Sequence, residues 1–127
     1  MTLFCFDVDG TLLSNEMKDM GQYVEGIIPT ETLVNLERIG HKVVVVSPSP
    51  YLPKRYTDDN HWFKRNGSND YRWENINDAM KSYDVPKESV RYVDDLESNR
   101  NQIEKWGVIS YSPEEFLSMY VTGKFDH

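Results

Sequence analysis

Short apolar runs alternate with amphipathic segments along most of the chain. The apolar runs cover residues 3–6, 43–46, 90–93 and 108–111, and they are bounded by glycine, proline or charged residues. Runs of this length and composition predict buried strands. The second run consists of four consecutive valines, which is typical of a strand buried on both faces of a parallel sheet.

The segments between and after these runs carry apolar residues at helical spacing. They predict helices over residues 30–39, 73–83, 97–106 and 113–120. Thr30 and Ser112 are the expected N-caps of the first and last helix, and Gly40 is the expected end of the first. The alternation of strand and helix predicts an α/β fold, a Rossmann-like three-layer sandwich whose mostly parallel central sheet is covered by helices on both faces.

Two stretches are less regular. Residues 12–26 are mostly polar and contain Gly21 and Gly26, which indicates a short flap. In residues 51–73 we expect a short helix near 54–59 and a brief strand at 61–64. With 127 residues, the chain is interpreted as a single domain over 1–127.

The composition of the chain bears on its cellular location and on its binding partners. The first strand begins almost at once, which leaves no room for a signal peptide, and no run approaches the roughly 20 apolar residues that span a membrane. The single cysteine, Cys5, favours a reduced, cytoplasmic location. A net charge of −7 argues against a protein that coats nucleic acid.

Polar side chains follow three of the predicted strands. Asp7 and Asp9 end the first, Ser47 ends the second, and Asp94 and Asp95 end a later one. Because the carboxyl ends of parallel strands meet at one edge, these side chains are expected to converge. Carboxylates without histidine or cysteine partners favour Mg²⁺, and such a site can bind and activate a phosphate group.

The same residues also fit plainer structural roles. Asp7 and Asp9 also fit a capped turn, whereas a calcium loop fails because Leu12 stands where its glycine is required. Ser47 is also compatible with an ordinary hydroxyl at a strand end. Asp94 and Asp95 also fit a pair of helix N-caps.

Three segments together resemble the haloacid dehalogenase superfamily of phosphohydrolases. Residues 6–12, FDVDGTL, look like its first motif; residues 43–47, VVVVS, resemble the second; and residues 92–99, YVDDLESN, are similar to the acidic fourth motif. The resemblance implies a Mg²⁺-dependent phosphatase that hydrolyses a phosphate monoester through an aspartyl-phosphate intermediate. It also implies a capless member of the superfamily, because residues 15–28 and 51–73 are too short for a cap domain.

The resemblance also implies roles for individual residues. Asp7 would be the nucleophile, and Asp9 would protonate the leaving alcohol and then deprotonate water. The metal ligands would be the carboxylate of Asp7, the backbone carbonyl of Asp9, and Asp94 or Asp95. Phosphate oxygens would be bound by Ser47 and by the backbone around Val8 and Gly10.

The superfamily's third motif, a lysine or arginine that faces the nucleophile, has no clear counterpart. Counting back from the helix around Ala79 favours Arg72, with Lys64, Arg65 and Lys54 as further candidates, and Lys64 is a second candidate phosphate ligand. A guanidinium suits this role because it binds carboxylate or phosphate with two nitrogens.

The sequence also suggests two alternatives to a phosphatase of small phosphate monoesters. An open, capless site admits a large substrate, and residues 51–73 carry five basic residues against three acidic ones among several aromatic residues. This stretch motivates a phosphatase of polynucleotide ends or of phosphoproteins. A neighbouring subunit of a homo-oligomer is another way to close such a site. The alternative of another class is a non-catalytic binding module, motivated by the unclear third motif.

Overall fold

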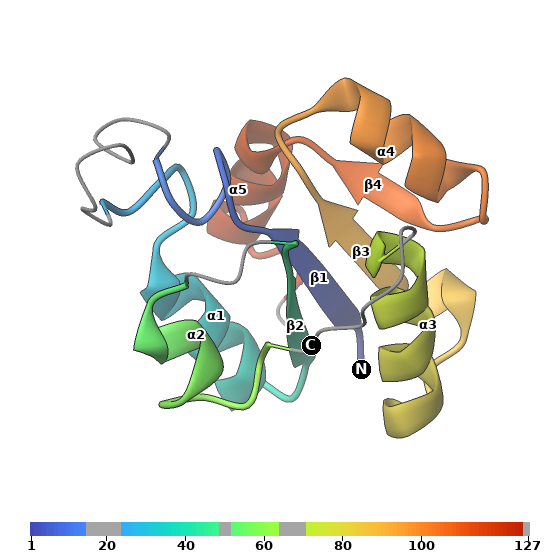
Figure 1. Cartoon of the computed structure of the whole chain (residues 1–127), viewed down its shortest axis with the longest axis horizontal. Coiled ribbons are helices and arrows are strands. Elements are labelled where there is room, and N and C mark those ends of the chain that lie inside the picture. The colour runs from blue at the N-terminus through green and yellow to red at the C-terminus, as the bar shows by residue number, and fades with distance from the viewer. Residues whose placement is uncertain (15–23, 49–51, 64–70, 126–127) are drawn as a thin grey trace.

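The centre of the molecule is a parallel sheet. The computed structural model describes residues 1–14, 24–48, 52–63 and 71–125. The sheet has four strands in the order β2-β1-β3-β4, and all its pairings are parallel (Figure 1). The strands are β1 (Leu3–Asp7), β2 (Lys42–Val46), β3 (Val90–Val93) and β4 (Ile109–Tyr111). The predicted α/β class with a parallel sheet is confirmed.

Helices cover both faces of this sheet. They are α1 (Thr30–Arg38), α2 (Lys54–Thr57), α3 (Tyr71–Tyr83), α4 (Glu97–Glu104) and α5 (Pro113–Val121), with a short 3-10 turn over Lys87–Ser89. Figure 1 shows α1 and α5 on one side of the sheet, and α3 and α4 on the other. Within the described ranges, no helix is long and apolar enough to cross a bilayer.

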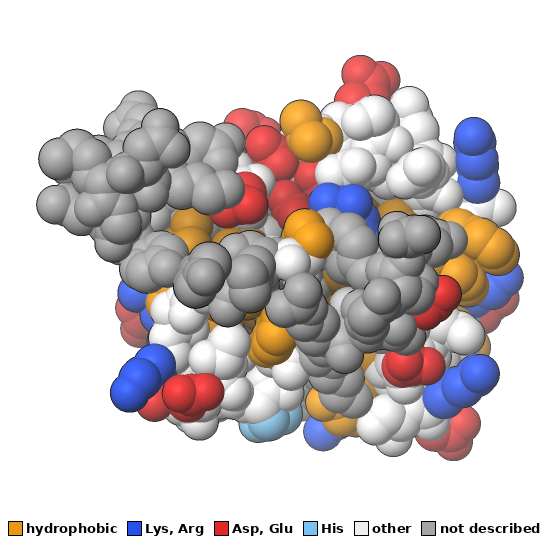
Figure 2. All heavy atoms as spheres, viewed as in Figure 1, with side chains coloured by type: hydrophobic (Ala, Val, Ile, Leu, Met, Phe, Trp, Pro, Cys, Tyr) orange, Lys and Arg blue, Asp and Glu red, His pale blue; other side chains and the backbone are white. Residues whose placement is uncertain are grey.

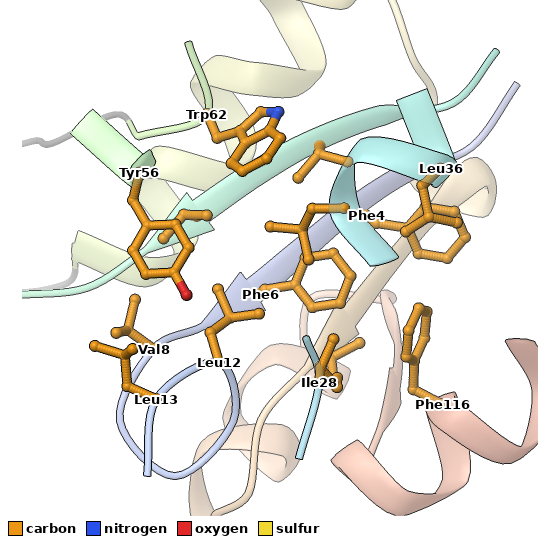
Figure 3. Packing of buried hydrophobic residues seen from close by; sticks show 14 of the residues in the cluster. Phe4, Phe6, Val8, Leu12, Leu13, Ile28, Leu36, Tyr56, Trp62 and Phe116 are labelled. Carbon is orange, nitrogen blue, oxygen red and sulfur yellow. The ribbon is translucent and has the colours of Figure 1, made fainter. Parts of the chain in front are cut away.

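The alternation of side chains along β1 divides the core into two layers. Phe4 and Phe6 point into a cluster with α1 and α5, where Phe116 stands edge-on to the Phe4 ring at 5.6 Å (Figure 3). Leu3 and Cys5 point the other way, into a cluster with α3 and α4. Because successive residues of a strand face opposite sides, a fully apolar strand is stable only when both faces are covered.

Two of the three predicted helix ends are confirmed, and the predicted N-cap of α1 is wrong. The N-cap of α1 is Pro29, and Thr30 is already helical; its N–H donates to Glu25 Oε1 at 3.2 Å. A side chain outside the helix therefore replaces the predicted Thr30 cap. Gly40 follows the helix with a φ of 103°, and Ser112 forms a capping box at the start of α5, so both of these predictions are confirmed.

Of the brief strand predicted at 61–64, the described part forms one bridge. Phe63 pairs with Val45 in a parallel bridge, and the Val45 N–H donates to the Trp62 carbonyl at 2.9 Å. The last residue of that expected strand, Lys64, lies outside the described residues. The sheet edge beyond β2 is thus covered by a loop contact that stops short of a regular strand.

The described ends of the predicted flap are held together. The Ser14 N–H donates to the Val24 carbonyl at 2.8 Å, and the Gly26 N–H donates to the Leu12 carbonyl at 2.9 Å. A Cβ on Gly26 would stand 2.7 Å from the Thr11 carbonyl oxygen, so only glycine fits this close approach. The excursion therefore begins and ends at one fixed point, next to the tip of β1.

A buried histidine links the two ends of the chain to the sheet. His41 Nδ1 accepts from the Thr2 N–H at 3.0 Å, so Nε2 is the donor to the Phe125 carbonyl at 2.6 Å. The ring is 4% exposed and packs edge-on against Phe4. Loss of this side chain leaves the buried Phe125 carbonyl and the partly buried Thr2 N–H without this partner, and a cavity beside Phe4.

We expect His41→Ala to lower the free energy of unfolding by about 2–4 kcal/mol, as measured by urea titration. The matched control is His61→Ala. His61 pairs with Glu37 but its side chain is 69% exposed, so its loss is expected to cost under about 0.5 kcal/mol. Equal effects of the two substitutions would contradict the structural role of His41.

Candidate active site

The register of the sheet brings the predicted residues to one level. Asp7, the last residue of β1, lies opposite Val46 of β2, and Phe6 lies opposite Val93 of β3. Ser47 therefore lies one residue beyond Val46, the β2 partner of Asp7. Asp94 follows Val93 and lies alongside Asp7. Asp7, Ser47 and Asp94 are 6%, 1% and 0% exposed.

Three carboxylates gather at this edge. Oxygens of Asp7, Asp94 and Asp95 all lie within 4.8 Å of one another. The side chain of Asp9 is not part of this group, and the expected role of its backbone carbonyl stays a prediction. Of the residues predicted to converge, the structure thus brings the carboxylates of Asp7, Asp94 and Asp95 together.

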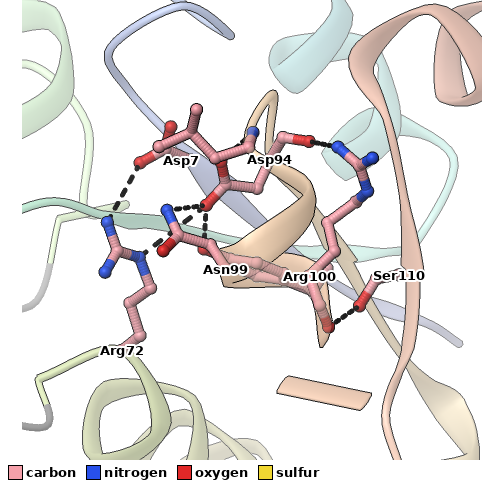
Figure 4. Close-up of polar contacts among 8 residues, drawn as sticks. Asp7, Arg72, Asp94, Asn99, Arg100 and Ser110 are labelled. Atoms are coloured by element: carbon pink, nitrogen blue, oxygen red, sulfur yellow. Dashed lines mark hydrogen bonds and ion pairs between the residues drawn. The ribbon is translucent and has the colours of Figure 1, made fainter. Parts of the chain in front are cut away.

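The cation beside these carboxylates comes from the first turn of α3. A terminal nitrogen of Arg72 lies 3.9 Å from Asp7 Oδ1, and Arg72 Nε lies 3.7 Å from Asp94 Oδ2 (Figure 4). The structure thus places the favoured candidate, Arg72, between two carboxylates. Lys54 is exposed at the start of α2, and the remaining candidates, Lys64 and Arg65, lie outside the described residues.

Hydrogen bonds fix Asp94 in one orientation. Its Oδ2 accepts from the Tyr92 hydroxyl and from Asn99 Nδ2, the latter at 3.0 Å, while Oδ1 accepts from the Leu96 N–H at 2.9 Å. Arg100 donates to the Asp94 backbone carbonyl at 2.7 Å (Figure 4). A carboxylate with both oxygens bonded is a rigid anchor, and this one orients Arg72.

Asp95 differs from Asp94 in having an unbonded oxygen. Asp95 Oδ1 is buried and has no hydrogen-bond partner among the described residues. A buried acceptor left in this way is costly unless a cation or donor meets it. Neither aspartate is the N-cap of α4, which is Leu96.

The cluster is electrostatically unfavourable without a cation. Burial first, and then the charge of Asp94, raises the pKa of Asp7 to about 9, although Arg72 acts in the opposite direction. Burial and the neighbouring Asp94 also raise the pKa of Asp95. A divalent cation relieves both effects, since it supplies the positive charge that the carboxylates lack.

The donor set fits Mg²⁺. All the clustered side-chain donors are carboxylate oxygens, which are the ligands Mg²⁺ prefers, and the unbonded Asp95 oxygen is available to it. Asp7, Asp94 and Asp95 could each offer one oxygen to an ion. The Asp94 oxygens already accept hydrogen bonds, whereas Asp95 Oδ1 does not.

The turn after β1 is tighter than the sequence indicates. The Val8 carbonyl accepts from the N–H groups of Thr11, Leu12 and Leu13, at 3.1, 3.0 and 3.0 Å, and Gly10 has a φ of 82°. The Gly10 N–H donates to the Leu13 carbonyl at 2.8 Å. This N–H is therefore engaged within the turn, and the positive φ requires glycine here, while the expected phosphate contacts of the backbone around Val8 and Gly10 stay predictions.

Two members of the site were not identified from the sequence. Tyr92 lies two residues before Asp94, and the period of a strand places both on one face, so this signal was present. Arg100 contacts a backbone carbonyl, which leaves no trace in a pattern of side chains. Asn99, the last residue of the acidic segment 92–99, lies in the site, where its Nδ2 donates to Asp94 Oδ2 at 3.0 Å.

Comparison of the chain with protein-family models, with curated proteins and with solved structures found no match. The fold and the geometry of the site therefore carry the functional argument.

Proposed function

We propose that this protein is a Mg²⁺-dependent phosphohydrolase of the haloacid dehalogenase type, which hydrolyses a phosphate monoester through an aspartyl-phosphate on Asp7. The observation that carries the proposal is the position of Asp7 at the tip of β1, next to Asp94, Asp95 and Arg72. A buried carboxylate among other carboxylates, with a guanidinium beside it, is costly for folding and is typical of a functional site.

In this proposal Asp7 attacks the phosphorus atom, so that an Asp7 oxygen–phosphorus bond forms as the bond to the alcohol oxygen breaks. Asp9 gives its proton to the departing alcohol, and then takes a proton from the water that attacks the phosphorus atom. That second step releases inorganic phosphate and restores Asp7. Arg72, held by Asp94, stabilises charge on the phosphate oxygens, and Ser47 offers a hydroxyl at the neighbouring strand tip.

The cation has a limited task in this scheme. When bound, Mg²⁺ neutralises charge on the phosphate and on Asp7 so that the two anions can approach. Asp7 and Asp95 would hold it through their side chains, together with the backbone carbonyl of Asp9.

The test is turnover of p-nitrophenyl phosphate with and without Mg²⁺, together with the melting temperature in both conditions. We expect cation-dependent turnover and a higher melting temperature with Mg²⁺. Asp95→Asn is expected to lower the apparent Mg²⁺ affinity by about 10-fold to 100-fold and to shrink the thermal shift. Asp78→Asn, an exposed change on α3, is the matched control.

The results separate the proposal from its alternatives. A thermal shift by Mg²⁺ without turnover of any phosphate ester would favour the non-catalytic binding module. If neither turnover nor a thermal shift appears with any divalent cation, the proposal is wrong.

Polynucleotide ends are a weaker candidate for the substrate. The aromatic residues of 51–73 motivated that alternative, but Tyr56 and Trp62 are fully buried in the core (Figure 3). Trp73 stacks on Trp106 with ring centroids 4.6 Å apart. Tyr56, Trp62 and Trp73 thus serve packing, which removes much of the surface in residues 51–73 on which bases would stack.

A further inference from the structure

A pocket of about 480 Å³ adjoins the candidate active site. It is lined by Gly10, Ser14, Glu25, Gly26, Ile27, Asp95 and Glu114. Two of these residues connect the pocket to the candidate active site. Gly10 lies in the turn directly after Asp9, and Asp95 is a proposed cation ligand. The volume is in the range of pockets that bind small molecules.

The described lining is acidic. It contains the carboxylates of Glu25, Asp95 and Glu114, and none of its described residues is basic. Figure 2 shows acidic side chains gathered above the carboxyl ends of the strands. Glu25 and Glu114 are exposed, so their potential adds up at the mouth of the pocket and is sensitive to salt.

The acidic groups come from separate parts of the fold. Glu25 lies at the paired base of the excursion, and its Oε1 is held by the Thr30 N–H. Glu114 stands in the first turn of α5, and Asp95 follows β3, with its Oδ1 buried and unbonded. Glu25 and Glu114 thus present negative charge from two separate elements to one volume beside the proposed reaction site, whereas the charge of Asp95 is offset by the cation that it is proposed to hold.

All phosphate monoesters carry a negative phosphate, so an acidic pocket can distinguish them only by the charge of the alcohol portion. An anionic alcohol portion would be repelled by the lining, and a neutral one would gain nothing from it. A positively charged one would be attracted while the phosphate is held by Arg72 and the cation. Charge complementarity of this kind acts on both binding and the rate of encounter.

We infer that the pocket binds the alcohol portion of the substrate and selects small phosphate monoesters that carry an ammonium group. This inference rests on the proposed phosphohydrolase activity and names its substrate class. Glu25 and Glu114 are the residues that determine the specificity.

The experiment compares three esters of similar size whose alcohol portions differ in charge: phosphoethanolamine, propyl phosphate and phosphoglycolate. For the wild type we expect kcat/KM to be about tenfold or more higher for phosphoethanolamine than for propyl phosphate, with phosphoglycolate the poorest. In the double variant Glu25→Gln, Glu114→Gln this preference is expected to fall to about threefold or less. High salt is expected to reduce the wild-type preference in the same direction.

Glu104→Gln, an exposed change on α4 away from the pocket, is the matched control and is expected to keep the wild-type preference. Turnover of all three esters at similar kcat/KM, or a preference that the double variant retains, would overturn the inference and leave the phosphohydrolase proposal intact. Failure to hydrolyse any ester, p-nitrophenyl phosphate included, would contradict the phosphohydrolase proposal itself, and the inference would fall with it.

Discussion

Asp7→Asn is expected to lower kcat for p-nitrophenyl phosphate by about 10³-fold or more, because the amide is not a nucleophile toward phosphorus. The same substitution is expected to remove the thermal shift caused by Mg²⁺. It should nevertheless leave the cation-free protein at least as stable as the wild type, because asparagine, unlike Asp7, needs no proton to be buried as a neutral group beside Asp94 and Asp95.

The sign of this stability effect follows from the pKa. In the cation-free folded protein the pKa of Asp7 is about 9, against an ordinary value of 3.8. Between these values the folded state binds the extra proton, so stability falls as pH rises. Melting temperatures in a chelator, from about pH 5 to pH 9, should decline more steeply for the wild type than for Asp7→Asn.

Asp78→Asn provides the control, since it makes the same chemical change on the exposed face of α3. It should retain wild-type activity and the wild-type dependence of melting temperature on pH. An Asp7→Asn protein that keeps more than about a tenth of wild-type kcat would exclude Asp7 as the nucleophile.

Arg72→Met is expected to lower kcat by about 10²-fold to 10³-fold, because the phosphate then lacks its protein-borne cation. Methionine keeps much of the apolar stem but removes the nitrogens that lie 3.9 Å from Asp7 and 3.7 Å from Asp94. Arg72→Lys should recover part of the activity, because an ammonium retains the charge without spanning both carboxylates.

Arg38→Met tests whether the loss of any arginine has this effect. Arg38 is exposed at the end of α1, and its substitution should change kcat by less than about twofold. Comparable activity of Arg72→Met and the wild type would mean that another cation, outside the described residues, faces Asp7.

The sheet was predictable because strong local signals agreed with the global fold. The buried run before Asp7 and the four valines before Ser47 have no stable alternative to a strand covered on both faces. Parallel connections then bring their tips together, so the gathering of Asp7, Asp94 and Asp95 followed from topology alone. Arg72 was identified by its distance from the helix around Ala79, and the structure places it against both carboxylates.

Other details depend on contacts that no local pattern carries. Pro29 is the N-cap of α1, and Glu25, a few residues earlier in the loop before the helix, accepts the hydrogen bond from the Thr30 N–H. The difference between Asp94 and Asp95 is set by donors from Tyr92 and Asn99. Likewise, Gly26 is required by the approach of the Thr11 carbonyl, which only the folded excursion creates.

The sheet order also determines when the site can exist during folding. β1 pairs early in the chain with β2, but its other neighbour is β3, whose tip provides Asp94 almost 90 residues after Asp7. Closing so long a loop is slow compared with forming local structure. Until β3 pairs with β1, Asp7 lacks the two carboxylates that oppose its ionisation. The charge conflict at the site thus arises only when β3 joins the sheet, and the earlier contacts of β1 with β2 form without it.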